Sequence, residues 1–252
     1  MASTFPNFPD KHSHDAIIEP AEIARMTASQ RTHPVPEAAI LTYAGHLTRT
    51  VAARPDVVVA EGYGTPLRRL HIVDGIGIAT DFGIGSPAAA MVTEDLIALG
   101  VRRIVNIGLA GGLQRHCGIG EIVVCTDAIR DEGVSHHYLP PGHHARPSAA
   151  LTERLGAALG EPLHHGATWT IDAPYRETVA EARHYQEQGV LTVEMEAAAV
   201  FAVASYRGAE AAAAFAISDS LAELVWNPRF GTPEVVSGLD RLLDAALAAL
   251  RQ

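Results

Sequence analysis

Two acidic residues, Glu196 and Asp219, are the side chains of this sequence with the clearest potential for chemistry. Glu196 closes the segment Val-Glu-Met-Glu at residues 193–196, and Asp219 closes Ala-Ile-Ser-Asp at residues 216–219. Each segment follows an apolar run that is typical of a buried strand. Ligands of open α/β sheets bind at the carboxyl ends of the strands. Two acids at such ends can bind a polyol and protonate a leaving group.

A glycine-rich segment, Phe-Gly-Ile-Gly-Ser-Pro at residues 82–87, joins a predicted strand to a predicted helix. Its glycines, Gly85 included, let the backbone approach a ligand, and the helix N-terminus offers free N–H groups. The dinucleotide-binding fingerprint is not met, because residue 88 is alanine. The alternative is a simple turn in which Ser86 caps the helix.

A second glycine-rich segment, Asn-Ile-Gly-Leu-Ala-Gly-Gly at residues 106–112, ends a long apolar run. Glycines at a buried strand end are unfavourable unless something must come close to the backbone. A bound base or sugar explains them, which makes Asn106 and Gly108 candidate binding residues. A bulge at the corner of a barrel is the alternative.

Predicted strands and helices alternate along the chain. The strands are expected at 38–43, 57–60, 76–82, 103–109, 121–129, 167–171, 190–193 and 212–217, and the helices at 86–99, 148–159, 176–188, 194–207 and 233–250. This alternation predicts a single α/β domain, at residues 36–252. Residues 1–35 are expected to be irregular, with one short helix near 19–28.

Composition excludes several classes of function. The chain has 252 residues and a net charge of −10, without a block of Lys or Arg, so we expect no nucleic-acid partner. It lacks the uncharged apolar stretch of about 18 residues that a membrane span needs. Two cysteines and a start unlike a secretion signal predict a cytoplasmic protein with reduced thiols. His12 and His14 are interpreted as exposed side chains, so no metal site is expected.

Five motifs in order resemble the nucleoside phosphorylase superfamily. They are residues 83–85, 106–112, 120–124, 193–197 and 218–219, and the resemblance covers roughly residues 38–250. The superfamily includes purine nucleoside phosphorylases, uridine phosphorylases and methylthioadenosine/adenosylhomocysteine nucleosidases. The resemblance implies a phosphorylase/hydrolase-like fold, in which helices flank a mixed central β-sheet. It also implies a homo-oligomer, either a dimer or a hexamer, and no cofactor, with phosphate as a possible co-substrate.

The resemblance assigns roles to three residues. Glu196 would bind the ribose 2′-hydroxyl, Met195 would pack beneath the sugar, and Asp219 would face N7 of a purine. Physical chemistry supports the two acids, because contacts to the 2-hydroxyl strengthen as the sugar gains oxocarbenium character. A general acid for the departing base contributes about 10²–10⁴-fold to the rate.

Three further candidates concern the base and the closing of the site. Tyr175 and Arg176 follow a predicted strand at the place where family members recognise the base. Tyr175 could stack on the base and Arg176 could bond to it, although a helix start with Arg176 at the surface is an equal alternative. Arg229 lies in the segment 226–231, and a resemblance to purine phosphorylases implies that it assists Asp219.

The chain departs from the family where phosphate would bind. Residues 42–47, Thr-Tyr-Ala-Gly-His-Leu, replace the Gly-Asp-Pro-x-Arg loop of the phosphorylases. Asn106 replaces an arginine, and Leu109 replaces a serine or threonine. The catalytic glutamate that nucleosidases carry after the first strand is also missing, which leaves His46 as a candidate base or anion ligand. The acceptor, phosphate or water, stays open.

These features together predict cleavage of the N-glycosidic bond of a nucleoside, of the purine type, with release of the free base. Residues 129–137 look most like uridine phosphorylase, so cleavage of a pyrimidine nucleoside is one alternative. A nucleoside-binding protein without turnover is the other.

Overall fold

The computed structural model describes residues 5–8, 10–63 and 69–251. The segment before the first strand contains the short helices η1 (Lys11–Ser13), α1 (Pro20–Met26) and η2 (Ala28–Gln30). Helix α1, which corresponds to the short helix predicted near 19–28, packs on the outside of α3 (Ser86–Leu99). The division of the chain at residues 35 and 36 stays a prediction.

The remaining elements alternate much as the sequence predicts. The strands are β1 (Ala38–Thr42), β2 (Val58–Glu61), β3 (Arg69–Val73), β4 (Ile76–Ala79), β5 (Arg103–Gly112), β6 (Ile122–Asp131), β7 (His144–Ala145), β8 (His164–Ile171), β9 (Thr192–Glu194), β10 (Glu210–Ser220) and β11 (Asn227–Pro228). The helices between them are α2 (Gly45–Ala52), α3, η3 (Ser135–His137), α4 (Ala149–Leu159), η4 (Pro174–Arg176), α5 (Val179–Glu187), α6 (Ala197–Arg207) and α7 (Pro233–Leu250).

The strands form one mixed sheet in the order β11-β10-β6-β8-β9-β5-β1-β4-β3-β2. Strand β5 pairs with β1 and β10 in parallel and with β9 antiparallel. Because β5 meets both β9 and β10, the strands β5, β10, β6, β8 and β9 close into a ring, from which β1, β4, β3 and β2 extend. The predicted α/β architecture with a mixed central sheet is confirmed.

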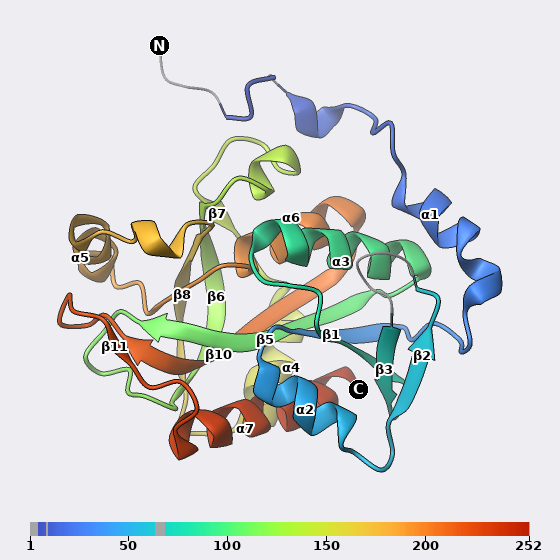
Figure 1. The fold of residues 1–252 in the computed structure, drawn as a ribbon. Coiled ribbons are helices and arrows are strands. Elements are labelled where there is room, and N and C mark those ends of the chain that lie inside the picture. The colour runs from blue at the N-terminus through green and yellow to red at the C-terminus, as the bar shows by residue number, and fades with distance from the viewer. Residues whose placement is uncertain (1–4, 9, 64–68, 252) are drawn as a thin grey trace.

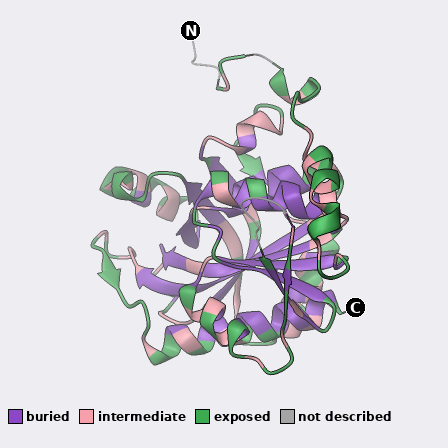
Figure 2. Cartoon of the chain, turned by 45° about the vertical axis from the view of Figure 1, so that its right-hand side comes forward, coloured by how far each residue is buried: buried purple, intermediate pink, exposed green. Residues whose placement is uncertain are grey.

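Helices cover both faces of the sheet (Figure 1). On β5, Ile104 belongs to the cluster under α3 and α6, whereas Val105 and Ile107 belong to the cluster over α7. This alternation follows from the two-residue period of a strand. The central strands and the inner faces of the helices are accordingly buried, while the peripheral helices expose their outer faces (Figure 2).

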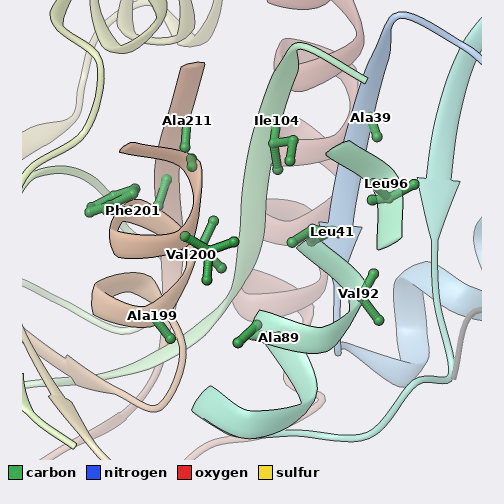
Figure 3. Packing of buried hydrophobic residues seen from close by; sticks show 14 of the residues in the cluster. Ala39, Leu41, Ala89, Val92, Leu96, Ile104, Ala199, Val200, Phe201 and Ala211 are labelled. Atoms are coloured by element: carbon green, nitrogen blue, oxygen red, sulfur yellow. The ribbon is translucent and has the colours of Figure 1, made fainter. Parts of the chain in front are cut away.

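The cluster between α3, α6 and the sheet is built from small and branched side chains. In Figure 3, Ala199 and Val200 of α6 lie on the side toward Ala89 of α3, whereas Val92 lies on the other side of α3, away from α6. Alanines let the two helices approach each other and the sheet closely. The glycine-rich segment 82–87 leads into α3, and the segment 193–196 with Glu196 leads into α6. This packing therefore holds both segments at one end of the helical layer.

Several elements differ from the sequence prediction. Part of the expected ligand-binding loop at residues 42–47 lies in helix α2, residues 69–73 form an unpredicted strand, β3, and the two-residue strands β7 and β11 were not predicted either. Helix α2 begins at a glycine and has an alanine at its N-cap, so the sequence does not mark where the helix starts. None of the described helices is both long and apolar enough to cross a lipid bilayer.

Candidate active site

A cavity of about 640 Å³ opens where β5, β9 and β10 end. Its walls include Glu196 and Met195 at the start of α6, and Asp219 near the end of β10. Residues from other elements complete it, among them Tyr43 after β1 and Tyr175 in η4. The volume is in the range of pockets that bind small molecules. The structure therefore brings the two predicted acids to one cavity.

Glu196 is fixed by the glycine-rich turn before α3. Its Oε1 accepts a hydrogen bond of 2.6 Å from the backbone N–H of Gly85, and Oε2 lies 3.3 Å from the N–H of Met195. The hydroxyl of Ser86 donates to the carbonyl of Met195 at 2.8 Å. Gly85 has φ of +88°, a conformation that favours glycine. The glycine motif thus positions the predicted ribose-binding carboxyl group.

Glu194, two residues before Glu196, stabilises the start of α6. Its Oε2 accepts hydrogen bonds from the backbone N–H groups of Glu196 at 2.8 Å and Ala197 at 2.7 Å, and its Oε1 accepts one from Thr170 at 2.5 Å. These contacts satisfy donors at the start of α6 that have no partner within the helix. Since Glu194 caps α6, the carboxyl group of Glu196 is left to face the cavity.

Ionisation of the two glutamates is disfavoured. Burial raises the pKa of Glu194 to about 8 and the pKa of Glu196 to about 7, and the charge of Glu196 adds to the rise at Glu194. Burial, followed by the charges of Glu196 and Glu194, also raises the pKa of Tyr43 well above its usual range. The Tyr43 hydroxyl is buried and has no hydrogen-bond partner among the residues that the structure describes, so it is a donor available to a ligand.

Asp219 is oriented by two donors. The hydroxyl of Ser218 donates to Oδ1 at 2.7 Å, and the indole N–H of Trp226 donates to Oδ2 at 2.9 Å. The register of β10 against β5 shifts between Ile217 and Asp219, and this irregularity re-aims the side chain. A Cβ on Gly111 would lie 2.7 Å from Leu221 and 3.2 Å from Oδ2 of Asp219. Gly111 is therefore required for the close approach of this acid.

Two predicted residues of β5, Asn106 and Gly108, are not among the described lining residues of the cavity. Asn106 is fully buried, and neither atom of its amide has a hydrogen-bond partner in the described part of the chain. At Gly108 a Cβ would lie 3.4 Å from the ring of Tyr43. Gly108 thus makes room for Tyr43, which in turn lines the cavity.

The base-recognition candidates divide between two cavities. Tyr175 is fully exposed and borders the first cavity, whereas Arg176 borders a second one of about 550 Å³. This second cavity includes Arg130, Glu132 and His136 from the segment that resembles uridine phosphorylase. Helix η4 therefore contributes Pro174 and Tyr175 to the first cavity and Arg176 to the second.

His46 and Arg229 are not among the cavity's lining residues. His46 lies in the first turn of α2, and its Nε2 is 2.8 Å from Oδ1 of Asp240 on α7. The predicted contact of His46 with water or an anion therefore has no support from this geometry. Arg229 is exposed, and its backbone N–H donates to the carbonyl of Ser218. Its catalytic role stays a prediction.

Three cavity residues were missed as individual candidates. Glu177 follows η4, and burial, with the charge of Asp219 second, raises its pKa to about 7. Trp226 was considered only as part of a loop, although it is bonded to Asp219. The position of Glu177 directly after Tyr175 and Arg176 was the available signal. Tyr43 carried no signal beyond its place after the first strand.

The cavity is strongly acidic. Glu177, Glu194, Glu196 and Asp219 are all among its lining residues, whereas no Lys, Arg or His is found among those that the structure describes. An anion such as phosphate is usually held by arginine forks and N–H groups. The described lining therefore provides ligands for hydroxyl and N–H groups but no cation for phosphate.

The chain belongs to the phosphorylase superfamily, whose sequence profile matches residues 21–248. The predicted family is thereby confirmed. The guanosine phosphorylase of Halorubrum lacusprofundi is 37% identical over a segment that covers 55% of this chain and 59% of that relative. The chain thus matches less than two thirds of the length of such curated relatives.

Solved structures share the fold. A uridine phosphorylase from Vibrio fischeri superimposes with a TM-score of 0.73 at 23% identity, covering 86% of this chain and 93% of the other. An AMP nucleosidase from Bacteroides thetaiotaomicron gives a TM-score of 0.72 at 22% identity, covering 93% of this chain and 99% of the other. At these identities the likeness concerns the fold alone.

Proposed function

We propose that this chain cleaves the N-glycosidic bond of a nucleoside and releases the free base. The observation that carries the proposal is the single cavity in which Glu196 and Asp219, from different elements, are both lining residues. Its family membership supports the same reaction, because the guanosine and uridine phosphorylases among its relatives are named for nucleosides.

The two acids divide the work in this proposal. Glu196 binds a ribose hydroxyl through Oε2, since Oε1 accepts the short bond from Gly85 whereas Oε2 has only the 3.3 Å contact with Met195. This contact strengthens as positive charge develops on the sugar. Asp219, held in place by Ser218 and Trp226, delivers a proton to the departing base in its protonated form, and the water that attacks the sugar releases the proton that replaces it. Met195 packs beneath the sugar.

The acidic lining favours water over phosphate as the acceptor. Phosphate would enter a cavity bordered by four carboxyl groups, with no basic side chain in the described lining. Any of these carboxyl groups that is ionised repels phosphate, and a carboxyl group that is neutral supplies no positive charge to hold it. Phosphorolysis would require a cation from outside this lining, for example from a second copy in the predicted homo-oligomer. The oligomer and the cytoplasmic location stay predictions.

Base release from a panel of purine and pyrimidine nucleosides, with and without phosphate, tests this function. We expect release of a purine base that does not depend on phosphate, with free ribose as the other product. Ribose 1-phosphate, formed only when phosphate is present, would refute water as the acceptor. Failure to release any base from the panel, with nucleoside binding intact, would favour the binding protein.

The role of Asp219 is tested by Asp219→Asn. We expect base release to fall at least a hundredfold, as expected for loss of a general acid, with near-normal nucleoside binding. Asp240→Asn is the matched control, because Asp240 is an aspartate of α7 outside the described lining and should leave base release unchanged. Full activity of Asp219→Asn would rule out the purine-type acid mechanism.

A further inference from the structure

A cluster of three potential metal ligands lies outside the cavity. His116 and Cys117 belong to the loop between β5 and β6, and His164 begins β8. One ligand atom from each residue lies within 4.8 Å of the others. Two imidazoles and a thiol are ligands that zinc and similar borderline-soft divalent cations prefer. We propose that His116, Cys117 and His164 bind one such cation, Zn²⁺ or its equivalent.

The distances require only a small adjustment. Zinc bonds of about 2.3 Å to sulfur and about 2.0 Å to nitrogen place tetrahedral ligand atoms about 3.3–3.6 Å apart. The ligand atoms must therefore approach one another by at most about 1.2–1.5 Å. His116 is exposed and its ring meets that of His164 edge-on, with the ring centroids 5.7 Å apart, whereas Cys117 is buried at 3% exposure. The ion would lie at the surface, with the thiol on its inner side.

Glu121 contacts His164 in the way that a carboxylate often contacts a metal-binding histidine. Its Oε2 is 2.8 Å from Nε2 of His164 and also accepts the backbone N–H of Gly118 at 2.7 Å. A metal-binding histidine commonly gives its second ring nitrogen to a carboxylate, which fixes the tautomer and the ring orientation. Nε2 of His164 is engaged in this way, so Nδ1 is the nitrogen left for the cation. An ordinary ion pair between Glu121 and His164 accounts for this contact but not for Cys117 and His116 beside it.

The loop that carries His116 and Cys117 adjoins the wall that holds Asp219. Gly120 N–H donates to the carbonyl of Ile217 at 2.8 Å, and Arg115 forms an ion pair of 2.8 Å with Glu223. A cation joining this loop to β8 would stabilise the end of β10. In this proposal the cation stabilises the structure and takes no part in the reaction. The proposal therefore does not depend on which bond is cleaved in the cavity.

The sequence predicted no metal site because its ligands are dispersed. His116 and Cys117 are adjacent, but His164 comes much later in the chain, after β6, η3, β7 and α4. Only the parallel pairing of β6 with β8, in which Val123 is opposite His164, brings them together. From the sequence, His12 and His14 were interpreted as exposed side chains and no metal site was expected. The proposal of a site at His116, Cys117 and His164 replaces that expectation.

Titration of the metal-stripped protein with Co²⁺ tests the site. We expect one equivalent to bind and to produce the near-ultraviolet thiolate-to-cobalt absorption, which Zn²⁺ then displaces. Cys117→Ala should remove this absorption, while Cys125→Ala, the matched control at the other buried cysteine, should retain it. No absorption in the unchanged protein, or absorption that persists in Cys117→Ala, would overturn the proposal.

Two further variants guard against a loss caused by misfolding. His116→Gln alters an exposed side chain, so far-ultraviolet circular dichroism should stay unchanged while Co²⁺ affinity falls at least tenfold. Glu121→Gln should weaken binding about 10–100-fold but keep the thiolate absorption, as expected for a residue that positions a ligand. Unchanged Co²⁺ affinity in His116→Gln would exclude the three-ligand site.

Discussion

The division of labour between Glu194 and Glu196 can be tested by replacing each in turn. Glu194→Ala would leave the buried backbone N–H groups of Glu196 and Ala197 without their acceptor. An orphaned buried donor costs about 1–3 kcal/mol, so the free energy of unfolding should fall by about 2–6 kcal/mol. That is a large fraction of the stability of a typical domain, which is about 5–15 kcal/mol.

The matched variants should separate stability from activity. Glu194→Gln keeps one oxygen as an acceptor for both N–H groups, so we expect most of the stability to remain. Glu196→Gln keeps an acceptor for Gly85 but loses the charge proposed to bind ribose, so base release should fall while stability changes little. Urea unfolding followed by circular dichroism gives the free energies. The assignment fails if Glu194→Ala unfolds like the unchanged protein, or if Glu196→Gln retains full base release.

The dependence on pH provides a second readout. Burial raises the pKa of Glu194 from 4.5 to about 8, so the folded protein binds more protons than the unfolded chain between these values. The contribution of this group to stability is therefore fully present below about pH 4.5 and is lost as the pH rises through about 8. Glu194→Gln should flatten this part of the stability profile. A profile identical to that of the unchanged protein would contradict the burial of a titrating group here.

Two other variants test donors of the cavity. Trp226→Phe removes the 2.9 Å hydrogen bond to Oδ2 of Asp219, so kcat for base release should fall about fivefold, which corresponds to about 1 kcal/mol; an unchanged kcat would show that the indole does not assist the acid. Tyr43→Phe removes a buried hydroxyl that has no partner in the described part of the chain, so unfolding should become no easier, while the Kd for nucleoside, measured by calorimetry, should rise about fivefold. A lower free energy of unfolding with unchanged Kd would mean that this hydroxyl stabilises the folded protein and does not bind the nucleoside.

Local sequence patterns predict the parts of the site that lie within one strand–helix unit. Glu196 and Asp219 each follow a continuous apolar run, and the ends of such runs coincide with the ends of β9 and β10 closely enough to place both acids correctly. Gly85 could be identified for the same reason, since a glycine before a helix with proline in its first turn marks a turn. These signals need no knowledge of distant residues.

Contacts between distant segments decide the rest. His46 was expected to face a ligand, but its environment is set by Asp240, far along the chain on α7. Arg176 and Tyr175 are neighbours in sequence, yet the turn of η4 directs them to different cavities. The bond from Trp226 to Asp219 depends on the short pairing of β11 with β10, for which two residues carry no periodic signal.

The arrangement of Glu194 and Glu196 also has a consequence for the chemistry. The same short segment supplies the carboxyl group that caps α6 and the one that faces the cavity, so neither can titrate without changing the field at the other. Interacting groups of this kind lose their protons in steps that belong to the pair. A ligand hydroxyl that bonds to Glu196 would favour its charged form and thereby raise the cost of charging Glu194. Nucleoside binding is therefore expected to change how protons are distributed between Glu196 and Glu194. Glu194 is also the residue that accepts hydrogen bonds from the start of α6.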